Sequence, residues 1–307
     1  MGRRYNRRMR PLATLVLLTP CLACAQIQPE FAYNGVGRAF PVQIKGNGKL
    51  ELRLLQGGSA EVIETVPAKS GKQDLAKLFP SLWTAKRPAV LYAQLVANGK
   101  PKGPALVLRP MVNPVLSVLK PDKTVEFQKD EDNEYAGIHA WVDQDLLLET
   151  NLGNMRFRLR PDCAPNTVRN IMDLAKGGYY RDVIWHRIVP VARGNPFVIQ
   201  GGDPSGTGSG GPGFAYALED SPLPHDFGVI SMARSTDPNT NGSQFFVCLS
   251  REGTARLDHK YASFGQLIEG AEVVRKTAAA PLEGERPKNP PTIRRAILVD
   301  AAPYSKP

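Results

Sequence analysis

The residue types best suited to chemistry in this chain of 307 residues lie in its second half. They fall in four short segments: residues 185–190 (WHRIVP), 197–203 (FVIQGGD), 231–234 (SMAR) and 241–247 (NGSQFFV). Arg187, Gln200 and Gln244 are thereby placed among aromatic and aliphatic neighbours. A permanently charged guanidinium in a largely apolar groove suits a substrate that is itself apolar and presents a carbonyl to be gripped.

The elements that must hold these side chains are predicted to be short strands. Alternation along residues 244–249 puts Gln244, Phe246 and Cys248 on one strand face. Strands are also expected at residues 145–150, 155–159, 183–189, 197–199, 228–233 and 293–298, and helices at 164–175 and 271–278. Many strands with two helices favour a closed barrel, which leaves no exposed sheet edge.

The four segments, in this order, resemble the cyclophilin family of peptidyl-prolyl isomerases over about residues 141–303, roughly half the chain. The resemblance implies an eight-stranded closed barrel capped by two helices, with Arg187 as the catalytic donor. It also implies a set of substrate-binding residues: Phe197, Val198, Gln200, Ala233, Arg234, Gln244, Phe246, Arg256, Leu257 and Tyr261. Rotation about an X-Pro bond breaks no covalent bond, so no nucleophile, metal or cofactor is expected.

Several residues depart from the family pattern. Val198 stands where Met is common, Arg234 replaces a frequent Asn, and Tyr261 occupies a position often held by His. Arg256 falls where many eukaryotic members carry Trp, so binding of cyclosporin-like ligands is expected to be weak.

Two other features of the sequence are interpreted as structural. Residues 206–211 (GTGSGG) satisfy a dinucleotide-binding pattern, but Pro212 follows instead of a helix, which indicates a glycine-rich loop beside the groove. His186 alternates with Arg187 and is expected to face the barrel interior if Arg187 faces the groove.

The first half of the chain predicts a second, smaller β domain. Residues 27–112 alternate with period two between glycine-rich turns, which is typical of a β-sandwich. Residues 74–83 are expected to interrupt the strands with a helical turn. The sequence does not indicate the role of this domain. Residues 113–140, which include the charged run 129–134, are interpreted as a solvated linker.

Residues 1–25 have the composition of a secretory signal peptide. Five arginines precede an apolar stretch at residues 12–19, and Ala23-Cys24-Ala25 gives a cleavage pattern before Gln26. The stretch is too short to span a bilayer, so no integral membrane span is expected. A twin-arginine signal and a lipid anchor at Cys24 remain as alternatives. The segment also contains Cys21, whose C-x-x-C spacing with Cys24 is interpreted as accidental.

The formal net charge of +10 falls to +5 once those five arginines are removed, so a nucleic-acid partner is not expected. The resulting hypothesis is an exported, periplasmic or extracellular, peptidyl-prolyl isomerase. Its partners would be proline-containing polypeptides, namely unfolded exported proteins. The alternative is a non-catalytic scaffold or chaperone that binds proline-bearing segments.

Overall fold

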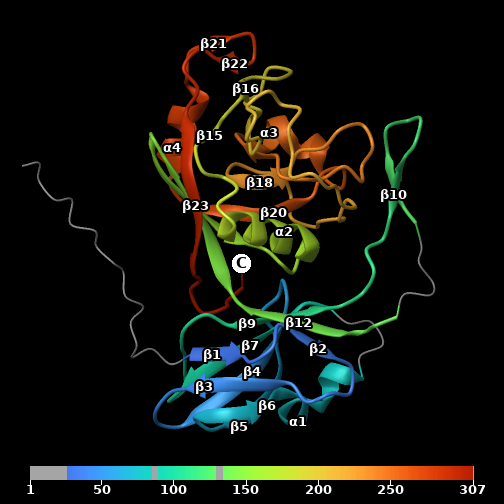
Figure 1. The fold of residues 1–307 in the computed structure, drawn as a ribbon, viewed down its shortest axis with the longest axis vertical. Helices are drawn as coiled ribbons and strands as arrows, with labels where there is room; N and C mark the ends of the chain where they lie inside the picture. The colour runs from blue at the N-terminus through green and yellow to red at the C-terminus, as the bar shows by residue number, and fades with distance from the viewer. Residues whose placement is uncertain (1–25, 85–88, 129–133, 307) are drawn as a thin grey trace, which may run out of the picture.

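A computed structural model describes residues 26–84, 89–128 and 134–306. They form two β-rich units, one above the other in Figure 1, with the C-terminal end of the chain between them. The predicted signal peptide, with Cys21 and Cys24, lies outside the described residues. Within the described ranges, no helix combines the length and apolar character needed to cross a bilayer.

The N-terminal unit contains two sheets. The smaller has the order β1-β3-β6, and the larger has the order β2-β12-β9-β7-β4-β5 with β8 beside β7. Their strands are β1 (Gln26–Pro29), β2 (Tyr33–Gly35), β3 (Pro41–Lys45), β4 (Leu50–Gln56), β5 (Val62–Ala68), β6 (Gly71–Asp74), β7 (Leu91–Ala97), β8 (Lys100–Pro101), β9 (Leu106–Pro110) and β12 (Gly137–Val142).

The two sheets share one apolar cluster, to which Val42 and Ile44 of β3 and Leu52 and Leu54 of β4 belong. The period-two pattern of β4 explains this burial, because Leu50, Leu52 and Leu54 point to the same face. Residues 74–83 contain α1 (Leu75–Leu78) and the 3₁₀ turn η1 (Pro80–Trp83). Asp74 caps α1 by accepting a hydrogen bond of 3.1 Å from the Ala76 N–H.

The segment expected to be a solvated linker is partly ordered. It contains the hairpin of β10 (Ser117–Leu119) and β11 (Val125–Phe127), and β12 of the N-terminal sheet begins at Gly137. In Figure 1 the hairpin stands beside the barrel. The side chain of Asn239 in the barrel donates to the Ser117 carbonyl at 2.7 Å, which ties the hairpin down. Most of the charged run 129–134 lies outside the described residues.

The C-terminal unit contains a sheet of nine strands in the order β15-β23-β13-β14-β20-β18-β19-β17-β16. They are β13 (Gln144–Thr150), β14 (Gly153–Leu159), β15 (Val183–Ile184), β16 (Arg187–Val189), β17 (Val198–Gly201), β18 (Val229–Met232), β19 (Phe245–Cys248), β20 (Ser263–Glu269) and β23 (Thr292–Asp300). The two end strands, β15 and β16, are separated only by Trp185 and His186. Both ends of the sheet therefore belong to one continuous stretch of chain, which closes the sheet into the predicted barrel. Because β15 and β16 act as one bent strand, the nine strands correspond to the eight that were expected.

The break between β15 and β16 makes the expectation for His186 wrong. Trp185 is the residue that enters the barrel core, where it packs edge-on against Phe245 at 5.7 Å between ring centroids. His186 is also buried, but it lines a surface hollow together with Arg187 and Gly208. The bend interrupts the alternation, so His186 and Arg187 face the same side.

Two helices pack into the barrel core, as expected. They are α2 (Pro165–Lys176), which starts with proline in its first turn, and α4 (Ala271–Ala278). Val168, Ile171 and Met172 of α2 are fully buried in the same cluster as Val274 of α4. Two shorter elements follow β19, namely α3 (Arg251–Thr254) and η2 (Ala255–Leu257), and Leu257 of η2 lines the groove described below.

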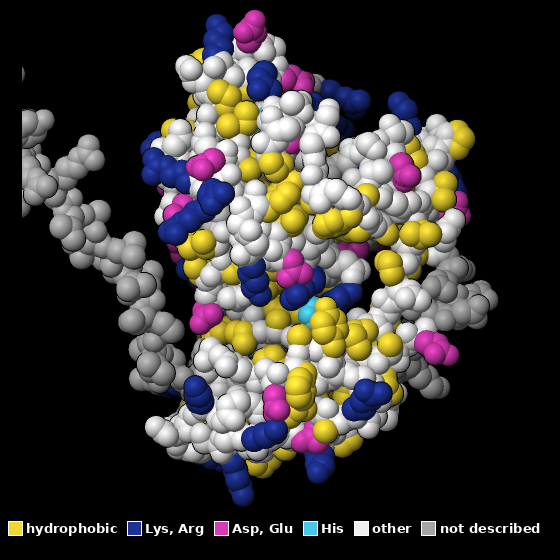
Figure 2. Space-filling view, in the orientation of Figure 1, with side chains coloured by type: hydrophobic (Ala, Val, Ile, Leu, Met, Phe, Trp, Pro, Cys, Tyr) yellow, Lys and Arg dark blue, Asp and Glu magenta, His cyan; other side chains and the backbone are white. Residues whose placement is uncertain are grey.

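The two units share apolar packing. On the face seen in Figure 2, hydrophobic side chains lie along the boundary between them. Tyr92 of β7 belongs to the barrel's core cluster and stacks on Tyr304, with ring centroids 3.5 Å apart. The Tyr304 hydroxyl accepts a hydrogen bond of 2.8 Å from the Gly58 N–H, and the Tyr304 backbone N–H donates to Gln94 at 2.8 Å. The C-terminal tail therefore bonds to two parts of the N-terminal unit.

Candidate functional site

A chain of side-chain hydrogen bonds begins at Arg187 on β16, passes through Gln200 on β17 and reaches Gln244, the residue before β19. Arg187 on β16 lies directly opposite Gln200 on β17, and its Nη1 donates to Gln200 Oε1 at 3.1 Å. Gln200 Nε2 donates in turn to Gln244 Oε1 at 3.1 Å. Gln244 Nε2 donates to the carbonyls of Gly208 and Gly210 at 3.0 and 2.8 Å. This order of donors and acceptors fixes the orientation of Arg187 and both amides.

Arg187 opens onto a pocket of about 240 Å³. Its lining is mostly apolar and aromatic: Arg187, Phe197, Val198, Gln200, Ala233, Arg234, Phe246, Leu257 and Tyr261. A pocket of this size and character accepts a small apolar ring, and the arginine and glutamine supply polar groups at its edge.

Phe246 belongs to the apolar cluster beneath this pocket and is held between two other rings. Tyr261 meets it edge-on at 5.7 Å, and His225 stacks on it at 6.0 Å between ring centroids. His225 is fully buried, with Nδ1 3.0 Å from Asp258 Oδ1 and Nε2 2.9 Å from Ser231 Oγ. Burial lowers the pKa of His225, and the nearby Asp258 opposes that shift only in part. The neutral imidazole is thus a packing partner of Phe246.

The parity predicted for β19 is confirmed. Phe246 and Cys248 belong to the cluster beneath the pocket, whereas Phe245 and Val247 belong to the barrel core. Cys248 and Cys163 are both buried free thiols. Burial raises the pKa of Cys163 to about 12, so its reactive thiolate form is suppressed.

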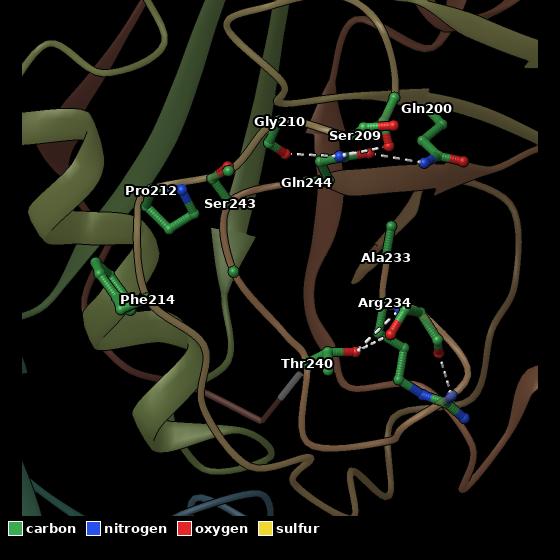
Figure 3. Close-up of a pocket in the computed structure, with 14 residues that line it drawn as sticks. Gln200, Ser209, Gly210, Pro212, Phe214, Ala233, Arg234, Thr240, Ser243 and Gln244 are labelled. Carbon is green, nitrogen blue, oxygen red and sulfur yellow. Dashed lines mark hydrogen bonds between the residues drawn. The ribbon is translucent and has the colours of Figure 1, made fainter.

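A second hollow of about 400 Å³ adjoins the first and shares Gln200, Ala233 and Arg234 with it. The glycine-rich loop forms one wall, and residues 240–244 form another (Figure 3). Gln244 lies at this hollow, between the loop carbonyls and Gln200. The two hollows together form one groove across the barrel surface.

The glycine-rich loop is organised by a buried carboxylate and contains no helix. Asp203 accepts from the Ser205, Gly208 and Gly210 N–H groups at 2.8, 2.7 and 3.0 Å. Burial alone would raise the pKa of Asp203, but these bonds and that from the Ser205 hydroxyl lower it to about 2. A Cβ on Gly210 would collide with this carboxylate, which explains the glycine. The interpretation of the loop as a groove wall therefore holds.

Two arginines predicted to bind substrate make internal contacts. Arg234 lines the groove, but its Nε and Nη2 donate to the Lys260 carbonyl at 3.1 and 2.8 Å and its guanidinium lies 4.6 Å from the Tyr261 ring centroid. Arg256 lines neither hollow; its guanidinium lies 4.2 Å from the Phe197 ring centroid. The other predicted site residues line the groove.

Sequence reasoning missed three residues around this groove. Asp203 and His225 support its walls, as described above, and Glu285 forms an ion pair with Arg187 at 2.6 Å between Oε2 and Nε. Asp203 lies within a recognised segment, so its position at the start of a glycine-rich loop was an available signal. No signal in the sequence pointed to Glu285, because it lies 98 residues beyond Arg187, the residue it pairs with.

Comparison with known proteins gives matches to the barrel. The family model for cyclophilin type peptidyl-prolyl cis-trans isomerase/CLD matches residues 146–298. Peptidyl-prolyl cis-trans isomerase-like 1 of Rhizopus delemar is 44% identical over 138 residues, covering 43% of this chain and 79% of that protein. Its namesake from Aspergillus oryzae is 40% identical over 162 residues, covering 51% and 96%.

A solved structure gives a further similarity. The cyclophilin type peptidyl-prolyl cis-trans isomerase of Cryptosporidium parvum, crystallised in the presence of the dipeptide Ala-Pro, is 35% identical with a TM-score of 0.47. The match covers 51% of this chain and 99% of that one.

Proposed function

This chain belongs to the cyclophilin-type peptidyl-prolyl cis-trans isomerase family, and we propose that it accelerates rotation about X-Pro bonds in the groove at Arg187, acting on exported proteins as they fold. The observation that carries the site assignment is the placement of Arg187. Its guanidinium borders a pocket of the right size for a proline ring, beside Phe246 and Leu257.

Rotation about a peptide bond meets a barrier of about 18–20 kcal/mol, because the nitrogen lone pair is delocalised into the carbonyl. A catalyst must therefore bind the twisted bond more tightly than the planar one. The apolar pocket holds the prolyl ring while the flanking peptide rotates. An N–H donor aimed at the prolyl nitrogen favours its pyramidal form, in which the lone pair is localised and able to accept a hydrogen bond.

Arg187 has the donors that this task requires. Nε donates to Glu285 and Nη1 to Gln200. Within the described part of the chain, the other three N–H groups of the guanidinium have no protein acceptor, so they are free for a substrate. Because the guanidinium is already oriented, little reorganisation is needed when the bond twists. Gln200 and Gln244 add amide groups able to hold the flanking backbone.

The site assignment is tested by tetrapeptide isomerisation with the mature full chain. The unmodified protein should accelerate the reaction, and Arg187→Ala should lower kcat/KM by roughly 100-fold, as when a single oriented donor is removed. Arg193→Ala is a control, because Arg193 is an exposed arginine on the loop between β16 and β17. Peptide binding without acceleration would favour the scaffold alternative and contradict catalysis in this groove.

We propose that the protein is exported, because residues 1–25 combine arginines, an apolar stretch and a cleavage pattern. The expected cleavage before Gln26 coincides with the first residue of β1, so removal of the signal peptide would leave the sheet complete. Intact-mass analysis of the processed protein separates the alternatives. Signal peptidase cleavage gives an N-terminal Gln26, whereas a lipid anchor gives an N-terminal acylated Cys24. An uncleaved chain in the cytoplasm would contradict both.

A further inference from the structure

Arg187, the proposed catalytic residue, forms an ion pair with Glu285, which lies far along the chain. Glu285 lies at the turn of the hairpin formed by β21 (Leu282–Glu283) and β22 (Arg286–Pro287). Its Oε2 accepts from Arg187 Nε at 2.6 Å. In Figure 1 the hairpin lies next to β16, the strand that carries Arg187. The carboxylate therefore reaches Arg187 from a part of the chain that lines neither hollow of the groove.

The hairpin that carries Glu285 is fixed in place. The Glu285 carbonyl accepts from the Ile188 N–H at 2.7 Å, one residue from Arg187. Arg286 Nη1 donates to the Gly206 carbonyl at 2.8 Å, which ties the hairpin to the glycine-rich loop. The pairing of Glu283 with Arg286 closes the turn. These bonds hold the Glu285 backbone at one place beside Arg187, within reach of its carboxylate.

We propose that Glu285 is a positioning residue, which acts on the prolyl bond only through the orientation of Arg187. Gln200 holds Nη1 and Glu285 holds Nε, so two fixed acceptors define the plane of the guanidinium. With that plane fixed, the remaining N–H groups face a constant direction. This inference rests on the proposed role of Arg187.

Orientation, more than charge, is the effect expected of Glu285. The side chains of Arg187 and Glu285 are 40% and 54% exposed, so solvent screens their attraction. A screened pair contributes little to stability, but it restricts the rotamers of a long side chain. Loss of the restriction should lower kcat while KM changes little, because the pocket that binds the proline ring is unaffected.

Three substitutions in the mature full chain distinguish the effect of the length of the Glu285 side chain, called its reach below, from the effect of its charge. Glu285→Ala removes both, Glu285→Asp keeps the charge but shortens the side chain, and Glu285→Gln keeps the reach and an acceptor oxygen. We expect kcat in the tetrapeptide assay to fall about 3- to 5-fold for Ala and Asp, the upper range for an exposed pair. Glu285→Gln should stay within about 2-fold of the unmodified protein. Glu283→Ala is the matched control, since it lines the same hollow without bonding to Arg187.

A second readout reports on the contact itself. The Arg187 Nε–Hε signal in a ¹⁵N spectrum should shift and exchange faster with water in Glu285→Ala and Glu285→Asp, but not in Glu285→Gln or Glu283→Ala. Melting curves for all variants check folding, and Asp remains informative if Ala is unstable. If Gln lowers kcat while Asp does not, charge is the cause and the positioning role is overturned.

The two proposals fail differently. If Arg187→Ala keeps its rate, the assignment of Arg187 is wrong whatever Glu285 does. If Arg187→Ala loses its rate while Glu285→Ala and Glu285→Asp behave like Glu283→Ala, the groove assignment stands and the role of Glu285 is overturned.

Discussion

The guanidinium of Arg256 lies over the ring of Phe197, with its central carbon 4.2 Å from the ring centroid. Its Nη1 also donates to the Gly253 carbonyl, so the cation is engaged on two sides. Phe197 lines the pocket of about 240 Å³ beside Arg187, whereas Arg256 does not. Arg256 therefore affects the pocket through Phe197, as a cation stacked on an aromatic wall.

This arrangement leads to a prediction about inhibitors. Cyclosporin-like ligands should inhibit the unmodified protein weakly, because Arg256 packs on the Phe197 ring and donates to the Gly253 carbonyl, and so presents no indole to a ligand beside Phe197. Arg256→Trp should tighten inhibition by about 30-fold or more, since a regained hydrogen bond and apolar contact contribute roughly 2–4 kcal/mol. Inhibition constants measured with one tetrapeptide would show this change. Arg193→Trp is the control, and potent inhibition of the unmodified protein would contradict the prediction.

Most of the groove can be located from the amino-acid sequence, and the reason is local. Arg187, Gln200 and Phe246 lie on short strands and Gln244 directly precedes one. Alternation along residues 244–248 specifies the face that Gln244, Phe246 and Cys248 share, whereas the place of these residues in the groove is what the resemblance of the short segments to a known family implies. The barrel and its two helices follow from the same periodic segments. The predictable part of the molecule is thus the part that short stretches of chain determine.

The remaining features depend on contacts between distant residues. The hairpin at residues 282–287 has no alternating apolar pattern, so nothing in its sequence indicates that Glu285 meets Arg187. β20 was also missed, because Gly265 and Gln266 interrupt its apolar residues. β12 lies beyond the charged run 129–134, where a linker was expected, and only its pairing with β9 and β2 makes it part of the N-terminal sheet.

A second prediction concerns acid stability. His139 on β12 is fully buried between the rings of Tyr33 and Trp141, at 4.4 and 4.9 Å between centroids. Burial, with a smaller effect from Arg169 and other nearby cations, lowers the pKa of His139 from 6.5 to about 4. A depressed histidine pKa gives stability that is complete above pH 6.5 and is lost as the pH falls toward 4. The shift corresponds to about 3 kcal/mol of unfolding free energy.

His139→Phe should remove this loss. The ring nitrogens of His139 have no hydrogen-bond partner among the described residues, so a phenyl ring should be tolerated at about pH 7.5. Denaturant unfolding would be measured at neutral pH and at two acidic pH values, one closer to 6.5 and one closer to 4. The loss of unfolding free energy on acidification would then be compared between the unmodified protein and His139→Phe. His259→Phe, at an exposed histidine paired with Asp220, is the control. An unchanged pH dependence in His139→Phe would show that other groups govern acid stability.

The last prediction concerns coupling between the two units. Tyr304 stacks on Tyr92 and bonds to Gly58 and Gln94, so it links the end of the barrel chain to separate parts of the N-terminal unit. Tyr304→Ala should lower the free energy of unfolding by about 3–5 kcal/mol, the usual cost of removing a large buried ring. Tyr304→Phe removes only the hydroxyl bond to Gly58 and should cost about 1 kcal/mol.

The same variants distinguish coupled from independent units. Because Leu55, Tyr92 and Val107 belong to the core cluster of the barrel, we expect the unmodified chain to unfold in one transition. Tyr304→Ala should separate that transition into two, since it removes the stacking between the units but leaves each sheet intact. Calorimetry with Phe31→Ala as a control, at a ring that is 56% exposed, would test this. Two transitions already present in the unmodified protein would show that the shared packing does not couple the units.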